Sequence, residues 1–109
     1  MAPAATGLFE AHLTVADLDA SIDFYHRVVG LELAHVTSAR QAAFLWIGSR
    51  GHAMLGLWGV GNGPQRMRMH VAFASSLEDV LGAHRALQSA GVSTLDFNEQ
   101  PTDEPVVLA

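Results

Sequence analysis

Within residues 9–30 the spacing of apolar side chains changes from every second residue to every third or fourth. This change predicts a strand that runs directly into a helix. Over residues 9–15 apolar and polar side chains alternate, which predicts a strand with one apolar face. Asp17 follows at the N-cap position of a helix. Apolar residues then recur at helical spacing until Gly30, a residue typical of the position just past a helix. The apolar residues of this helix are Leu18, Ile22, Tyr25 and Val29.

Three strand-like stretches follow the helix and complete one β-α-β-β-β unit. They cover residues 31–36, 41–47 and 53–58, and they are separated by Ser38 and by the turn "GSRG". A glycine-rich stretch comes next and has the composition of a linker.

The rest of the chain predicts the beginning of a second unit of the same kind. The stretch "RMRMHVAFA" over residues 66–74 alternates like a strand. Ser75 and Glu78 form a capping box for a second helix, which Gly91 ends. A strand is predicted over residues 92–97, and the closing "VVLA" has the pattern of another strand's first residues. The predicted buried face of the second helix consists of Leu77, Val80, Ala83, Leu87 and Ala90.

Self-comparison at an offset of 58 residues supports this internal repeat. The matching pairs are His12 with His70, Ala16 with Ala74, His26 with His84 and Arg27 with Arg85. We therefore expect one α+β domain of paired βαβββ modules that form a cup-shaped mixed sheet. The first module covers residues 8–58, a linker covers 59–66, and an incomplete second module covers 67–109.

Composition excludes several kinds of chemistry. The sequence has no cysteine and no lysine, which removes disulfides, thiolate sites and Schiff bases. A net charge of −5 argues against nucleic acid as a partner, and no apolar run is long enough to cross a membrane. Six histidines and eleven carboxylates remain as the reactive groups. We expect a cytoplasmic protein with a small-molecule substrate.

The segment "HLTVADLDASIDFYHRVVGLEL", continued by "FLWIG", "MLGLW" and "MHVAFA", resembles the vicinal oxygen chelate superfamily. This superfamily includes glyoxalase I, the bleomycin- and fosfomycin-resistance proteins and the extradiol dioxygenases. The resemblance covers residues 8 to about 100. It implies two modules around a divalent metal, which side chains from the first and last strands of each module hold. It also implies a substrate with two neighbouring oxygens and a carboxylate that acts as general base.

The resemblance leaves two candidates for the metal ligand on the first strand. Relatives that bind metal carry histidine seven residues before the Asp-Leu pair, and Glu10 occupies that position here. The internal repeat instead pairs His12 with His70. We favour Glu10, both as ligand and as catalytic carboxylate, and keep His12 as the alternative. His70 is the second predicted ligand, and carboxylate with imidazole suits Zn²⁺, Ni²⁺, Mn²⁺ or Fe²⁺.

Four residues are candidates for substrate binding. Arg68 shares the face of His70 on the predicted strand, although a surface arginine is the simpler interpretation. On the strand over 53–58, leucines suit the helix side and leave Trp58 as a wall of the cup. The full set of candidates is Arg68, Trp58, Trp46 and Phe44.

Two functions stay open at this point. One is a glyoxalase-type, metal-dependent lyase or isomerase. The other is a metal-free protein that sequesters an antibiotic, as the bleomycin-resistance members do. Nothing in this sequence matches the strand with a glutamate ligand that closes the second module in relatives, so either the chain is truncated or the strand is lost. We favour truncation, with a third ligand beyond Ala109, and we expect a homodimer because the incomplete module leaves a strand edge uncovered.

Overall fold

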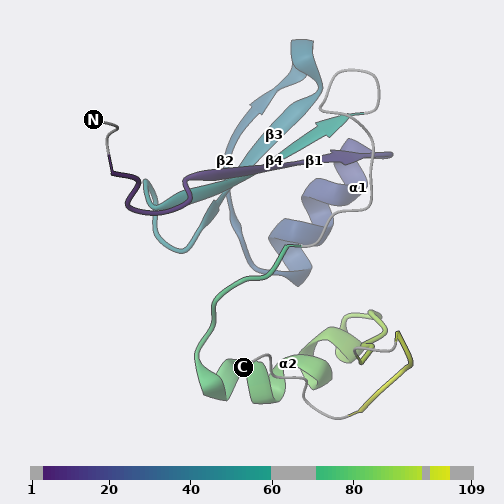
Figure 1. The fold of residues 1–109 in the computed structure, drawn as a ribbon. Coiled ribbons are helices and arrows are strands. Elements are labelled where there is room, and N and C mark those ends of the chain that lie inside the picture. Colours follow the sequence, from purple (N-terminus) through teal and green to yellow (C-terminus); the bar gives the residue numbers. More distant parts are fainter. Residues whose placement is uncertain (1–3, 60–70, 97–98, 104–109) are drawn as a thin grey trace. The chain divides into compact units, whose positions relative to one another are not determined.

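The computed structural model describes residues 4–59, 71–96 and 99–103 (Figure 1). Contacts divide the chain into two compact units, Met1–Met69 and His70–Ala109. Each unit is described by itself below.

The first unit contains a four-stranded mixed sheet. Its strands are β1 (Glu10–Val15), β2 (Glu32–Thr37), β3 (Ala42–Ile47) and β4 (Ala53–Gly59). The order in the sheet is β1-β4-β3-β2, with β1 parallel to β4 and the other pairs antiparallel. The sequence predicted all four strands, with ends that differ by at most one residue. The predicted β-α-β-β-β order of this unit is confirmed.

The helical segment between β1 and β2 begins and ends where the sequence predicts. α1 covers Leu18–Asp23, and the Asp17 side chain caps it by accepting a hydrogen bond from the Ala20 backbone N–H at 3.0 Å. A π-helical turn, Phe24–Val28, continues the helix. Gly30 then takes a positive φ of 89°, the conformation expected of a glycine just past a helix.

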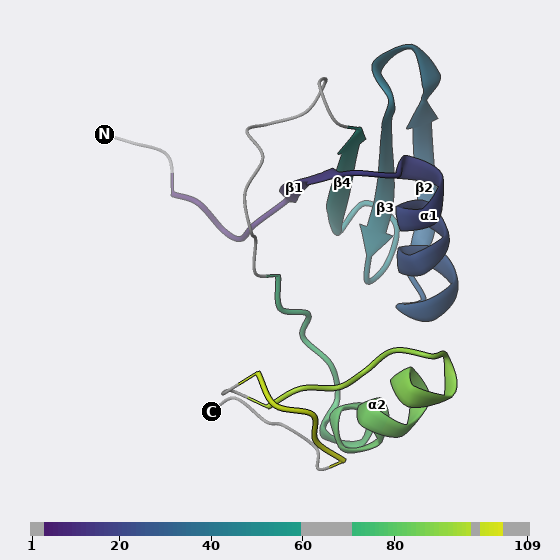
Figure 2. The ribbon, with the colours of Figure 1, turned by 90° about the vertical axis from the view of Figure 1, so that its right-hand side faces the viewer.

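α1 lies against one face of the sheet, as Figure 2 shows, and the core of the unit lies between them. The leucines predicted to face the helix are at its centre. Leu45, Leu55 and Leu57 are fully buried, and Leu13 is 9% exposed. Alternation along β1, β3 and β4 therefore places every second side chain in this core and the others on the opposite face.

The second unit contains one long helix, α2 (Leu77–Ser89). Its N-cap is Ser76, whose hydroxyl accepts from the Asp79 backbone N–H at 3.2 Å. The predicted capping box that starts at Ser75 was wrong by one residue. The extended backbone of Ser76 aims its hydroxyl into the first helical turn. Gly91 ends the helix with a φ of 82°, as predicted.

The strands predicted for the second unit do not form in its described part. Residues 71–74 and 92–96 contain no strand, and the only bridge there joins Leu95 to Pro101. Of the predicted strands, residues 66–70, 97 and 106–109 lie outside the described residues. No residue of α2 is buried within this unit; of the predicted buried face, Val80, Ala83 and Leu87 are half-buried and Leu77 is 67% exposed. Within the described residues of this unit, α2 has no sheet on which to pack.

The chain is thus an α+β protein with one complete βαβββ module and an incomplete second half among the described residues. In the same residues, none of the helices combines the length and the apolar character that a membrane crossing requires.

Candidate functional site

The sheet face away from α1, called the aromatic face below, carries most of the predicted site residues. Strand pairing sets His12 of β1 and Phe44 of β3 on either side of Gly56 in β4. Trp58 and Trp46 follow on the same face by alternation. The aromatic face consists of Glu10, His12, Thr14, Ala42, Phe44, Trp46, Met54, Gly56 and Trp58.

A chain of two hydrogen bonds crosses the aromatic face from β4 to β1. The Trp58 indole Nε1–H donates to His12 Nδ1 at 2.8 Å. On the other side of the imidazole, Nε2 lies 3.1 Å from Glu10 Oε2. Both nitrogens of His12 are therefore engaged within the protein. The His12 and Glu10 side chains are 30% and 37% exposed, so the chain ends at a carboxylate that solvent reaches.

Three aromatic rings pack together around these two hydrogen bonds. The imidazole of His12 and the indole of Trp58 are close to parallel, with ring centroids 5.7 Å apart and planes 25° apart. Phe44 meets both rings edge-on, at 5.8 Å from His12 and 6.2 Å from Trp58. Gly56 makes room for them, because a Cβ there would lie 3.1 Å from both His12 Cδ2 and Phe44 Cε1. Bare backbone at this position is the condition for the cluster.

An arginine borders the cluster at the end of the turn before β3. The Arg40 guanidinium lies 5.0 Å from the centroid of the Trp58 ring, in cation–π geometry. The next residue, Gln41, adopts a left-handed conformation with φ of 50°, and its carbonyl accepts from the Gly59 backbone N–H at 2.8 Å. Neither Arg40 nor Gly56 was among the site residues predicted from the sequence. Gly56 could have been predicted as a point of close packing, because it is a glycine inside a strand pattern. No local sequence pattern indicates a role for Arg40.

A second carboxylate on the sheet is already paired with an arginine. Glu32 lies opposite Trp46 in the strand pairing, and Arg50 donates from Nε to its Oε1 at 2.7 Å. The hydrogen bond from Arg50 holds the pKa of Glu32 below its ordinary value. Glu10 has only the imidazole of His12 as a recorded partner among the described residues.

The predicted site residues thus separate into two groups. Glu10, His12, Phe44 and Trp58 come together in one cluster, and Trp46 lies on the same sheet face. His70 and Arg68 lie outside the described residues, so their part in the site stays a prediction.

Among the described residues, the Glu10 side chain suits a divalent metal as a ligand, whereas the His12 side chain does not. No three His, Asp or Glu side chains of the described part gather closely enough to hold an ion. His12 Nδ1 accepts from Trp58, so a proton on the neutral ring belongs on Nε2, and no lone pair is left for a metal. The Glu10 carboxylate retains Oε1 as a hard oxygen donor. A metal here fits the carboxylate together with ligands from outside the described residues.

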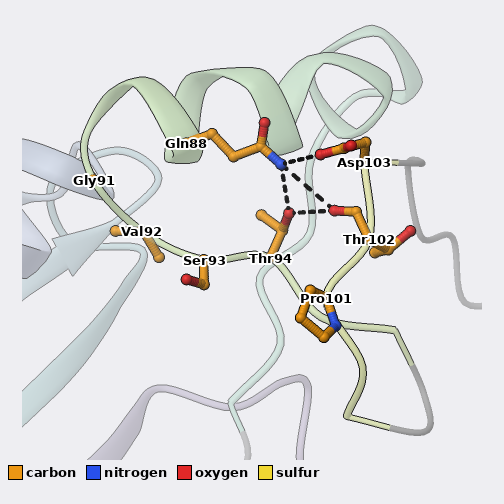
Figure 3. Close-up of a pocket in the computed structure, with 8 residues that line it drawn as sticks. All are labelled: Gln88, Gly91, Val92, Ser93, Thr94, Pro101, Thr102 and Asp103. Carbon is orange, nitrogen blue, oxygen red and sulfur yellow. Dashed lines mark hydrogen bonds between the residues drawn. The ribbon is translucent and has the colours of Figure 1, made fainter.

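The second unit has its own pocket, of about 370 Å³, beside the C-terminal end of α2 (Figure 3). Gln88 Nε2 donates to Thr94 Oγ1 and to Asp103 Oδ1, both at 3.0 Å. Thr94 Oγ1 in turn donates to the Thr102 carbonyl at 2.7 Å. These polar groups satisfy one another, and their role is to fasten the segment after α2 onto the helix.

Comparison with known proteins gives one consistent family. Residues 7–105 match the family described as Glyoxalase/Bleomycin resistance protein/Dioxygenase superfamily. An integron cassette protein from the mobile metagenome of the Halifax Harbour sewage outfall is 31% identical, with a TM-score of 0.69 over 80% of this chain and 72% of that chain. A possible glyoxalase from Bacillus cereus is 25% identical, with a TM-score of 0.60 over 80% and 76%.

A third similar structure shares the fold alone. Lactoylglutathione lyase from Agrobacterium tumefaciens is 21% identical, with a TM-score of 0.59 over 80% of this chain and 72% of that one. None of the curated proteins matches the sequence.

Proposed function

Because this chain belongs to the Glyoxalase/Bleomycin resistance protein/Dioxygenase superfamily, we propose that it is a glyoxalase-type enzyme acting on a small substrate with two adjacent oxygens. Its site is the aromatic face, and Glu10 is both the metal ligand and the catalytic carboxylate. The observation that carries the proposal is the position of Glu10. It stands on the aromatic face at the end of a hydrogen-bond chain, partly exposed and without an arginine partner among the described residues.

The proposed chemistry follows from what these side chains can do. Glu10 accepts a proton from a carbon next to a substrate carbonyl, as a general base within hydrogen-bond reach. The rings of Phe44 and Trp58 form an apolar wall that orients the substrate and excludes water. A divalent metal, Zn²⁺, Ni²⁺, Mn²⁺ or Fe²⁺, would supply Lewis-acid stabilisation of the developing oxyanion. Glu10 and the predicted ligand His70 would hold it.

The proposal predicts that Glu10→Gln loses metal affinity while Glu32→Gln keeps it. Losing an outer-shell partner already costs about 10–100-fold in affinity, so losing a ligand is expected to cost at least that much. Titration of the full chain with Mn²⁺ or Ni²⁺, followed by calorimetry, measures the change. Glu32→Gln is the matched control, because this carboxylate lies on the same sheet and Arg50 already occupies it.

The same titration applied to His70→Ala tests the second predicted ligand, and an equal loss is expected. Metal affinity that is unchanged in Glu10→Gln would overturn the proposal, whatever the result for His70.

One observation favours the alternative function, a metal-free protein that sequesters a drug. The near-parallel rings of Trp58 and His12, with Phe44 edge-on and Arg40 above Trp58, form a surface suited to a planar ligand. Bleomycin is the probe, and its binding is followed through tryptophan fluorescence. Binding that persists in the presence of a chelator, with no metal uptake by the wild type, identifies this function instead.

We also propose that the protein acts as a homodimer. β1 is an edge strand of the four-stranded sheet that the described residues form. Leu8 and Phe9, just before β1, are 78% and 50% exposed. A two-fold symmetric partner would cover these exposed apolar side chains. Light scattering at micromolar concentration is expected to give twice the chain mass of 11.6 kDa, and Phe9→Glu is expected to shift it toward one. A wild type that stays monomeric contradicts this.

A further inference from the structure

We propose that His12 is a positioning residue whose tautomer Trp58 sets, so that the imidazole holds Glu10 and binds no metal itself. The inference rests on the proposed role of Glu10. It gives a different role to the residue that the internal repeat offered as a metal ligand.

The two hydrogen bonds run in one direction, because Trp58 donates to His12 and His12 donates to Glu10. An indole nitrogen only donates, so the 2.8 Å contact makes His12 Nδ1 the acceptor. The neutral imidazole then carries its proton on Nε2, which points at Glu10 Oε2 at 3.1 Å. This tautomer is assigned from the hydrogen-bond roles. A carboxylate is an obligatory acceptor when ionised, so each group in the chain has the partner that it needs.

The packing of the cluster prevents the imidazole from turning over. A half-turn of the ring would exchange each nitrogen with a carbon, and both hydrogen bonds of His12 would be lost. The hydrogen bonds to Trp58 and Glu10 and the edge contact with Phe44 hold the ring plane. The bare backbone of Gly56 lies against the ring, with an ideal Cβ position only 3.2 Å from His12 Cγ. The ring is therefore fixed in both orientation and proton position.

His12 therefore holds the Glu10 carboxylate through only one of its two oxygens. His12 donates to Oε2, which leaves Oε1 for a ligand. Groups that hydrogen-bond to a metal ligand orient it, and their loss typically costs about 10–100-fold in affinity. We expect His12 to contribute by this route.

The tautomer is measured directly by ¹⁵N NMR of the histidine rings in the full-length, metal-free protein. His12 is expected to show a bare Nδ1 and a protonated Nε2 in its neutral form. Trp58→Phe removes the indole donor and leaves the Glu10 contact to hold the proton on Nε2, so it is expected to raise the share of the Nδ1-protonated tautomer. Trp46→Phe is the matched control, because Trp46 lies on the same sheet face, and it is expected to leave the His12 signals unchanged. A wild-type proton on Nδ1, or wild-type signals in Trp58→Phe, overturns the proposal.

Titration with Mn²⁺ alone then separates positioning from ligation. His12→Ala lacks the donor to Glu10 and is expected to lose about 10–100-fold in affinity. His12→Gln keeps an N–H near the position of Nε2 and is expected to recover most of that loss. Equal losses in both variants, at equal unfolding free energies, contradict positioning. If Glu10→Gln leaves metal binding unchanged, the proposed function fails, whereas the NMR result still decides the tautomer.

Discussion

Replacing Leu55 by alanine is expected to lower the free energy of unfolding of the first unit by about 2–5 kcal/mol. Leu55 is fully buried in β4, where it lies between Ala11 of β1 and Leu45 of β3. β4 also contacts α1, so neighbours on several sides would have to close the cavity. Total stabilities of small domains are about 5–15 kcal/mol, so this single change removes a large share.

Leu33→Ala is the matched control for this prediction. Leu33 pairs with Leu45 and points to the same sheet face, but at the β2 edge, where it is 41% exposed. We expect it to lose about 1 kcal/mol or less, because truncation there leaves no closed cavity. Urea denaturation followed by tryptophan fluorescence compares the two. Equal losses would show that the core is not centred on β4.

Gly56→Leu is expected to cost about 1–3 kcal/mol and to break the hydrogen bond between Trp58 and His12. The first added carbon alone would lie 3.1 Å from both His12 Cδ2 and Phe44 Cε1, and three more follow it. The rings must move apart, which separates the indole donor from its acceptor. The indole N–H signal of Trp58 in NMR reports the bond, and denaturation reports the free energy.

Gly82→Ala is expected to raise the free energy of unfolding, in contrast to Gly56→Leu, because the space around Gly82 is open. Gly82 lies inside α2, and nothing stands within 4 Å of its ideal Cβ position. Alanine there is expected to stabilise the helix by about 1 kcal/mol. A Gly56→Leu variant that keeps both the stability and the Trp58 signal of the wild type would contradict the close-packing argument.

The sequence predicted the first unit well because its signals are local. The change of period around Asp17 and the glycine at position 30 fixed the helical segment, and alternation fixed each strand. The second unit was harder for the same reason. Alternation indicates which residues can form a strand, but a strand also needs a partner, and residues 71–74 have none among the described residues. The choice between Ser75 and Ser76 as N-cap depended on backbone angles that adjacent serines do not reveal.

The candidate site could be predicted only as a set of residues on one face. Alternation placed Glu10 and His12 together, and the leucines of β4 placed Trp58 on the opposite side from the helix. That Trp58 donates to His12 could not be predicted, because it depends on the parallel pairing of strands far apart in the chain. Arg40 reaches Trp58 because of the geometry of the turn before β3, which no sequence motif predicts. The roles of His70 and Arg68 stay predictions.

The position of β1 has a consequence for the order in which the protein assembles during synthesis. β2, β3 and β4 pair with their neighbours in the chain, so they can form as soon as each emerges from the ribosome. β1 is made first but joins the described sheet by pairing with β4, and the His12–Trp58 contact spans 46 residues. Closing such a long loop is slow compared with closing hairpins. The nascent chain is therefore expected to pair β2, β3 and β4 first, and the Glu10 carboxylate, the proposed catalytic group, is expected to be oriented only when β1 joins.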